Sequence, residues 1–189
     1  MLSSNLLKMK NILLTGNPGI GKTTIIKKIV SRIDSAGGFL TEEIRKNNIR
    51  KGFKIVTLDG KEGVLASCDI KTDYRVGKYY VNIADLENIA GKSIEHCVSD
   101  KNIEFIVIDE IGKMELFSQR FQKAVISALN SQKKVIGTIK EKPNTFTDEI
   151  KKRQDVKVIY VTIENRDAIV DKILTDIKEN CGNKLGMTL

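Results

Sequence analysis

Short apolar segments alternate with amphipathic segments along most of the chain. Nearly continuous apolar runs, rich in β-branched residues, predict strands that are covered on both faces. They lie at residues 10–15, 103–110, 134–139 and 156–162. Amphipathic segments predict helices at residues 22–34, 84–99, 117–131 and 164–179. This alternation predicts a three-layer α/β fold with a mainly parallel central sheet, whose ligands bind at the carboxyl ends of the strands.

The chain between the first predicted helix and the helix at residues 84–99 follows a β-rich pattern. Residues 37–45 and 53–58 predict two strands, and the polar stretch at residues 46–51 predicts the loop that joins them. This is the pattern of a β-hairpin, inserted after the first strand and helix, whose loop is longer than two residues. Residues 64–67 predict a third strand in this region.

The length of 189 residues is typical of one α/β domain. Hydrophobic residues make up 41% of the chain and charged residues 30%, which is ordinary for a globular protein and argues against disorder. We place the domain at residues 9–179. Residues 1–8 are interpreted as a disordered extension or the product of an upstream start, and residues 180–189 as a C-terminal tail.

Cysteine and apolar content exclude several classes of protein. The three cysteines, Cys68, Cys97 and Cys181, lack C-x-x-C spacing and indicate neither a disulfide framework nor a zinc site. No apolar run approaches the roughly 18 residues that span a membrane, and residues 1–8 are too short and polar for a signal peptide. We therefore expect a cytoplasmic monomer without a membrane partner.

The chain is basic, with a formal charge of +8 from 32 basic and 24 acidic residues. Such an excess attracts polyanions. The lysines are scattered, however, and form no long basic run. This distribution favours a solvated surface over a nucleic-acid interface and leaves an RNA partner open.

The clearest chemical signal is GNPGIGKT at residues 16–23, which fits the phosphate-binding pattern G-x-x-x-x-G-K-[ST] directly after the first predicted strand. Backbone N–H groups at a helix N-terminus bind phosphate oxygens, and glycines let the backbone approach them closely. Lys22 is expected to reach the β- and γ-phosphates, and the Thr23 hydroxyl to bind Mg²⁺. The predicted nucleotide-binding residues are Gly16, Asn17, Pro18, Gly19, Ile20, Gly21, Lys22, Thr23 and Thr24.

A second acidic element follows the apolar run at residues 103–108, which ends in Asp109 and Glu110. Phosphate-loop enzymes hold their metal with a carboxylate at the end of a buried strand, and Asp109 is the candidate, together with Thr23. Successive side chains of a strand point in opposite directions, so Glu110 could accept a proton from an attacking water. The pair therefore favours hydrolysis, with Glu110 and Lys22 as catalytic residues.

The sequence VIDEIGKMELF at residues 107–117, together with the loop at residues 16–24, resembles the THEP-type nucleoside-triphosphate phosphatases, also described as cancer-related nucleoside-triphosphatases. The resemblance spans about residues 10–178, with further similar segments at residues 38–45, 52–53, 75–81, 155–158 and 164–166. It implies a P-loop NTPase fold related to the RecA-like NTPases. It also implies Mg²⁺-dependent hydrolysis of ATP, GTP, CTP, UTP and related nucleotides to the diphosphate and phosphate.

Carried over by position, the resemblance implies that residues 16–24 bind the nucleotide, that Asp109 lies beside the metal and that Glu110 is the base. Residues 140–144 match the family only loosely, so we assign no sensor residue there. No group of residues indicates a base-specific pocket, and we expect broad base specificity.

Other residues are weaker candidates. Lys113 could neutralise charge that develops on the γ-phosphate, and a surface lysine on a loop is an equal alternative. Arg166 follows the last predicted strand and is a candidate for contact with the nucleotide base. We expect His96, the single histidine, to be structural or exposed. The tyrosine-rich segment at residues 74–80 more often covers a core edge than lines a pocket.

Two other functions fit the same motifs. In a nucleoside or polynucleotide kinase, Glu110 would activate an acceptor hydroxyl, and added nucleosides or 5′-hydroxyl RNA would accelerate ATP consumption. In a nucleotide-gated switch that binds RNA or protein, slow hydrolysis would only reset the switch, and a partner would stimulate it. The pair of Asp109 and Glu110 argues against the switch, because a switch needs no base at this position.

Overall fold

The central part of the sheet is parallel. In spatial order it consists of β2 (Ala36–Lys46), β7 (Phe105–Ile111), β8 (Lys134–Ile139), β1 (Asn11–Thr15) and β9 (Val156–Tyr160). One strand, β8, thus separates β1, which leads into the glycine-rich loop, from β7, which carries the acidic pair. The prediction of an α/β fold with a parallel central sheet is confirmed. The computed structural model describes residues 10–181, so the predicted extension at residues 1–8 and residues 182–189 of the predicted tail lie outside it.

Further strands continue the sheet beyond β2 with antiparallel pairing. In spatial order they are β3 (Ile49–Thr57), β4 (Glu62–Ser67), β6 (Tyr79–Val81) and β5 (Arg75–Val76). The turn between β2 and β3 is only two residues long, Asn47 and Asn48, and both have positive φ values, of 50° and 61°. Such a turn matches the twist of paired strands, and asparagine tolerates this conformation.

The prediction of a loop at residues 46–51 is therefore wrong. The charged residues there continue the two strands instead of joining them, because the exposed end of a hairpin accepts polar side chains on both faces. The pair of β5 and β6 was not predicted either, since strands of two and three residues are too short to show a period.

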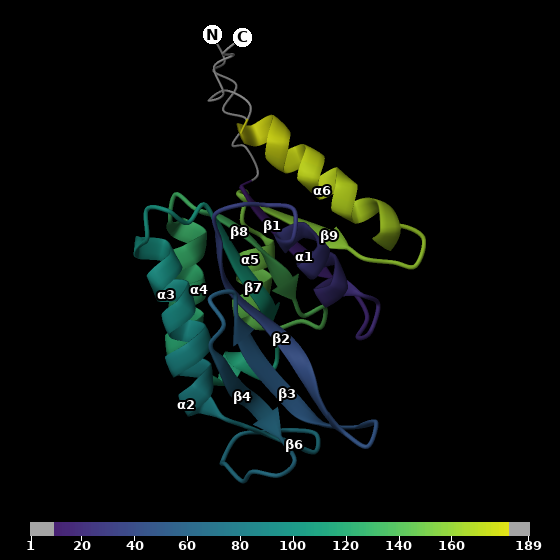
Figure 1. Cartoon of the computed structure of the whole chain (residues 1–189), viewed down its shortest axis with the longest axis vertical. Helices are drawn as coiled ribbons and strands as arrows, with labels where there is room; N and C mark the ends of the chain where they lie inside the picture. The colour runs from purple at the N-terminus through teal and green to yellow at the C-terminus, as the bar shows by residue number, and fades with distance from the viewer. Residues whose placement is uncertain (1–9, 182–189) are drawn as a thin grey trace.

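Helices cover both faces of the sheet (Figure 1). One face carries α2 (Ile83–Asp85), the π-helical segment η1 (Leu86–Gly91), α3 (Lys92–Ser99), the 3₁₀ turn η2 (Glu115–Phe117), α4 (Gln119–Asn130) and α5 (Thr145–Lys151); the other carries α1 (Lys22–Val30) and α6 (Arg166–Cys181). A hydrophobic core lies on each face of the sheet, and alternate side chains of β7 pack into one or the other. Ile106 and Ile108 pack on the α3 and α4 side, and Phe105 and Val107 on the α1 and α6 side.

Some helix bounds differ from the prediction. Helix α1 ends at Val30, four residues early, and the helix expected at residues 84–99 contains the π-helical segment. Helix α5 was not predicted, because its seven residues are too few for a clear amphipathic period. Its start is marked by Asn144, whose side chain accepts a hydrogen bond from the Thr147 N–H. Within residues 10–181 no helix has the length and apolarity needed to cross a membrane.

Candidate functional site

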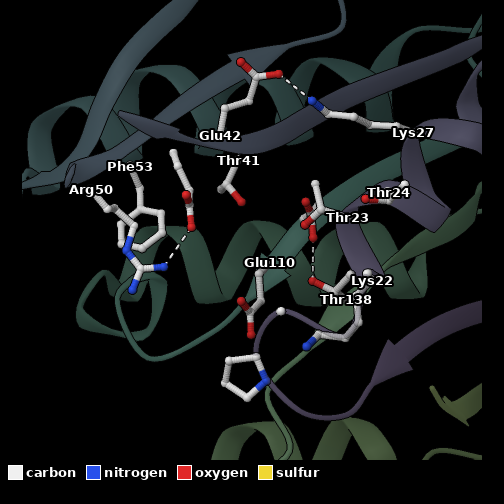
Figure 2. A pocket seen from close by; sticks show the side chains of 15 residues that line it. Lys22, Thr23, Thr24, Lys27, Thr41, Glu42, Arg50, Phe53, Glu110 and Thr138 are labelled. Carbon is white, nitrogen blue, oxygen red and sulfur yellow. Dashed lines mark hydrogen bonds and ion pairs between the residues drawn. The ribbon is translucent and has the colours of Figure 1, made fainter. Parts of the chain in front are cut away.

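A cavity of 740 Å³ at the carboxyl ends of β1, β7 and β8 brings together residues that are far apart in the sequence (Figure 2). Its lining comes from the glycine-rich loop and the start of α1, from β2 and β3, and from the ends of β7 and β8. Of the predicted site residues, those that line it are Pro18, Gly19, Gly21, Lys22, Thr23, Thr24, Asp109 and Glu110. Gly16, Asn17 and Ile20 belong to the same loop but lie outside the lining.

The glycine-rich loop has a backbone that other residues adopt only with strain. Gly16 and Gly21 have φ values of 134° and 109°, and a Cβ at Gly16 would lie 2.7 Å from the carbonyl oxygen of Val161. Helix α1 begins directly after Gly21, so its first N–H groups face the cavity. The Lys22 ammonium donates to the carbonyl oxygens of Gly16, at 2.7 Å, and of Asn17, at 3.0 Å. It therefore lies folded over the loop.

Asp109 combines deep burial with an unsatisfied oxygen. Its exposed fraction is 1%, and the Thr138 hydroxyl donates a hydrogen bond to Oδ1 at 2.7 Å. Oδ2 is buried and has no hydrogen-bond partner among the described residues. Burial raises the pKa of Asp109; the hydroxyls of Thr138 and Thr23 act in the opposite direction, although no hydrogen bond of ordinary geometry joins Thr23 to Oδ2.

This arrangement fits a hard divalent cation. A buried carboxylate oxygen without a donor among the described residues and a neighbouring threonine hydroxyl are oxygen ligands of the kind that Mg²⁺ prefers. The threonine, Thr23, lies where the glycine-rich loop passes into α1. A bound cation would provide the opposite charge that a buried carboxylate such as Asp109 needs beside it. The residues present are thus able to hold Mg²⁺.

Glu110 lines the same cavity, one residue beyond Asp109 across a cis peptide bond. Burial raises the pKa of Glu110, and the adjacent Asp109 carboxylate raises it further, while Lys22 and Lys140 lower it. A carboxyl group whose pKa is raised is a stronger base when it ionises. Glu110 therefore has the location and the chemistry of a proton acceptor.

A third acidic residue, Glu115, was not predicted from the sequence. Its exposed fraction is 4%, and its Oε2 accepts a hydrogen bond from the Gly112 N–H at 3.1 Å. Burial and the charge of Glu110 raise the pKa of Glu115 to about 8. Its neighbours in the sequence, Met114 and Leu116, are apolar, which is the only signal that this glutamate is buried.

The opposite wall of the cavity comes from β2 and β3 and contains an arginine, Arg50, that was not predicted from the sequence either. Arg50 Nη1 donates to Glu43 Oε1 at 2.7 Å, and Nε donates to the Tyr79 hydroxyl at 3.1 Å. The guanidinium carbon lies 5.3 Å from the centroid of the Phe53 ring. Glu43 and Tyr79 raise the pKa of Arg50 above its already high ordinary value. No sequence signal identified it, because the residue was assigned to a loop.

A second ion pair crosses the rim of the cavity. The Lys27 ammonium, on α1, contacts Glu42 Oε1, on β2, at 2.5 Å (Figure 2). Glu42 also lies 3.5 Å from the ammonium of Lys54. Three cationic side chains, Lys22, Lys27 and Arg50, thus line the cavity, and the last two are paired with carboxylates.

The weaker candidates lie elsewhere. Lys113 is exposed in the turn after β7, and Arg166 begins α6 with Nε 4.0 Å from Asp167 Oδ1. Neither side chain lines the cavity. His96 is exposed on α3, 3.6 Å from a carboxylate oxygen of Asp100.

Comparison with known proteins relates the whole domain to one family. The family model described as NTPase matches residues 11–174. The nucleoside-triphosphatase THEP1 of Thermotoga maritima is 49% identical over 173 residues, which cover 92% of this chain and 98% of that protein. The human cancer-related nucleoside-triphosphatase is 41% identical, covering 90% of this chain and 98% of the relative. The crystal structure of THEP1 from Aquifex aeolicus superposes with a TM-score of 0.78 at 38% identity, covering 87% of this chain and 97% of that one.

Proposed function

The chain belongs to the NTPase family, and from this premise we propose that it hydrolyses nucleoside 5′-triphosphates to the diphosphate and phosphate with Mg²⁺ and with broad base specificity. The observation that supports the proposal is the cavity that the glycine-rich loop, the buried Asp109 and Glu110 line together. ATP, GTP, CTP and UTP share the triphosphate, which is the part that these residues are suited to bind.

The glycine-rich loop and the start of α1 hold the phosphates. The backbone N–H groups of residues 21–24 bind phosphate oxygens at the positive end of the helix dipole. The Lys22 ammonium exchanges its contacts with the carbonyls of Gly16 and Asn17 for the β- and γ-phosphate oxygens. Thr23 and Asp109 would hold Mg²⁺, which when bound neutralises charge on these phosphates.

Glu110 prepares the attacking water. Its carboxylate accepts a hydrogen bond from the water and takes its proton as the water oxygen bonds to the γ-phosphorus. The bond between the γ-phosphorus and the bridging oxygen breaks, and the electron pair of that bond stays on the diphosphate. Lys22, beside both phosphates, stabilises the charge that develops on the leaving oxygen.

The test is phosphate release from ATP, GTP, CTP and UTP, comparing the wild type with Glu110→Gln, which keeps the shape of the side chain and removes the base. We expect the wild type to hydrolyse several of the four nucleotides. The variant should bind them with unchanged affinity and lose about 100-fold or more in kcat. Removal of Mg²⁺ with a chelator should stop the wild type.

Two results would overturn the proposal. Full activity of Glu110→Gln would remove Glu110 from the reaction. A wild type that is inert on all four nucleotides, and that consumes ATP only when a nucleoside, a 5′-hydroxyl RNA or a protein partner is added, would indicate the kinase or the switch instead.

A further inference from the structure

The wall of the cavity that comes from the antiparallel strands β2 and β3 holds one cationic group, the guanidinium of Arg50, in a fixed position. Arg50 is bound on two edges, by Glu43 through Nη1 and by the Tyr79 hydroxyl through Nε, and it stacks on the ring of Phe53. The ring of Tyr79 packs on Phe53 edge to face, with centroids 5.3 Å apart, so the support of the guanidinium is itself anchored in the core.

The fixed group faces the phosphate site. Arg50, Lys22 and Glu110 line one cavity, and Figure 2 shows Arg50 and Lys22 on opposite sides of Glu110. The Arg50 side chain keeps 45% of its surface exposed, and no hydrogen bond joins Nη2 to another of the described residues. A planar guanidinium presents its donors in a fork that matches phosphate oxygens. Nη2 is thus the donor that is available to a ligand in the cavity.

The charge of the site shows why such a group is needed. Transfer of the γ-phosphoryl group spreads negative charge over its outer oxygens. Asp109 and Glu110, which line the cavity at this point, add negative charge, while Lys22 approaches from the side of the loop. Lys113, the cation that the sequence suggested for this purpose, does not line the cavity.

We infer that Arg50 is a further catalytic residue of the NTPase, whose guanidinium binds the γ-phosphate oxygens as the bond to the diphosphate breaks. The inference rests on the proposed hydrolysis and names a residue of the same site. Glu43 and Tyr79 are positioning residues, which hold the guanidinium at the wall and reduce the reorganisation needed during the reaction. The protein thus supplies within its own chain a group that some NTPases receive from a partner.

The same hairpin provides a matched control. Arg45 also pairs with Glu43, with Nη2 2.6 Å from Oε2, and its side chain is 54% exposed. It does not line the cavity. Arg45 and Arg50 therefore share a carboxylate partner, a charge and a strand pair, and differ in whether they face the phosphate site.

The experiment measures kcat and KM for ATP in Arg50→Ala, Arg50→Lys and Arg45→Ala. We expect Arg50→Ala to lose about 100-fold in kcat with KM within about threefold of the wild type, because the contact forms in the transition state. Arg50→Lys keeps the charge and the apolar stem over Phe53, and should lose less. Arg45→Ala should stay within about twofold of the wild type, since rim charges contribute little.

A second readout separates catalysis from folding. Mg²⁺, ADP and aluminium fluoride together imitate the transferring phosphoryl group, whereas Mg²⁺ and ADP alone do not. We expect Arg50→Ala to bind ADP as the wild type does, which reports an intact fold, and to lose the additional affinity that aluminium fluoride confers.

Equal losses of kcat in Arg50→Ala and Arg45→Ala would overturn the inference, because they would indicate a general effect of charge. So would full binding of the aluminium fluoride complex by Arg50→Ala. If Arg50→Ala does not fold, the same two measurements on Arg50→Lys decide, and wild-type values in both would refute the assignment. Failure of the proposed hydrolysis can be distinguished from failure of the role of Arg50. In the first case the wild type itself would release no phosphate from any nucleotide, and the inference about Arg50 would also be wrong.

Discussion

The hydroxyl of Thr138, on β8, donates a hydrogen bond to Asp109 Oδ1, on the neighbouring strand β7, at 2.7 Å. This bond occupies one carboxylate oxygen and leaves the other, Oδ2, buried and without a donor among the described residues. A threonine that appears in no nucleotide motif thus determines how Asp109 is oriented toward the candidate metal position.

We predict that Thr138→Val, which keeps the shape of the side chain and removes the hydroxyl, raises the Mg²⁺ concentration needed for half-maximal phosphate release by about 10-fold. Groups that orient a metal ligand typically change metal affinity by about 10- to 100-fold. A Mg²⁺ titration at saturating ATP measures this. Thr138→Ser keeps the hydroxyl and should behave like the wild type; an unchanged titration in Thr138→Val would contradict the orienting role.

A second prediction concerns the pH dependence of stability. The pKa of Glu115 is raised to about 8 in the folded protein, whereas a glutamate in an unfolded chain has a pKa of about 4.3. Between these values the folded state binds a proton that the unfolded state has lost, so the free energy of unfolding falls as the pH rises, at up to about 1.4 kcal/mol per pH unit. The contribution of Glu115 to stability is fully present below its pKa in the unfolded chain, about 4.3, and is lost by its pKa in the folded protein, about 8.

Glu115→Gln stays neutral and can still accept the Gly112 N–H, so it should lack this pH dependence. We expect the variant and the wild type to have similar urea midpoints near pH 5, and the variant to be more stable at pH 8 and above. The measurement is urea unfolding without nucleotide at both pH values. Parallel pH profiles for the two proteins would show that Glu115 is ionised in the folded state.

Two glycines should respond to alanine in opposite directions. A Cβ at Gly137, on β8, would lie 2.1 Å from the carbonyl oxygen of Ile108, so the neighbouring strand must move, and we expect a loss of about 1–3 kcal/mol. At Gly91 the nearest atom, the carbonyl oxygen of Leu86, is 3.6 Å away and the backbone is helical. There alanine should gain about 0.5–1 kcal/mol. Urea unfolding at fixed pH measures both, and a loss at Gly91 would contradict the expectation that a Cβ there makes only an ordinary van der Waals contact.

The position of Lys113 leads to a negative prediction. Its side chain is exposed and does not line the cavity, so Lys113→Ala should keep kcat within about twofold of the wild type. Steady-state phosphate release from ATP measures this. A large loss of kcat with unchanged nucleotide binding would support the charge-neutralising role that the sequence left open.

Local patterns account for what the sequence predicted well. The glycine-rich loop and the acidic end of β7 are each contained in a few consecutive residues, and their chemistry follows from residue type and from the strand that precedes them. The family and the parallel central sheet were therefore predictable, and both are confirmed. The roles of Lys22, Asp109 and Glu110 stay predictions.

The predictions were wrong or incomplete where the structure of a segment depends on residues that lie far away in the sequence. The polar residues around Asn47 and Asn48 indicated a loop, and only the pairing of β2 with β3 shows that two asparagines suffice for the turn. Glu115 sits among apolar neighbours, and charge alone predicts exposure, so its burial could not be inferred without the packing above β7.

The sequence by itself determined which chemical groups are candidates in this protein: a loop suited to phosphate, a candidate metal-side carboxylate and a candidate base, because each of these is local. Only the tertiary structure decided which other groups meet them. Arg50 and Thr138 lie far from both motifs in the chain, and they reach the cavity because the sheet places β3 and β8 on either side of β2 and β7. Contacts across strands depend on sheet order and register, which residue type and spacing alone do not specify.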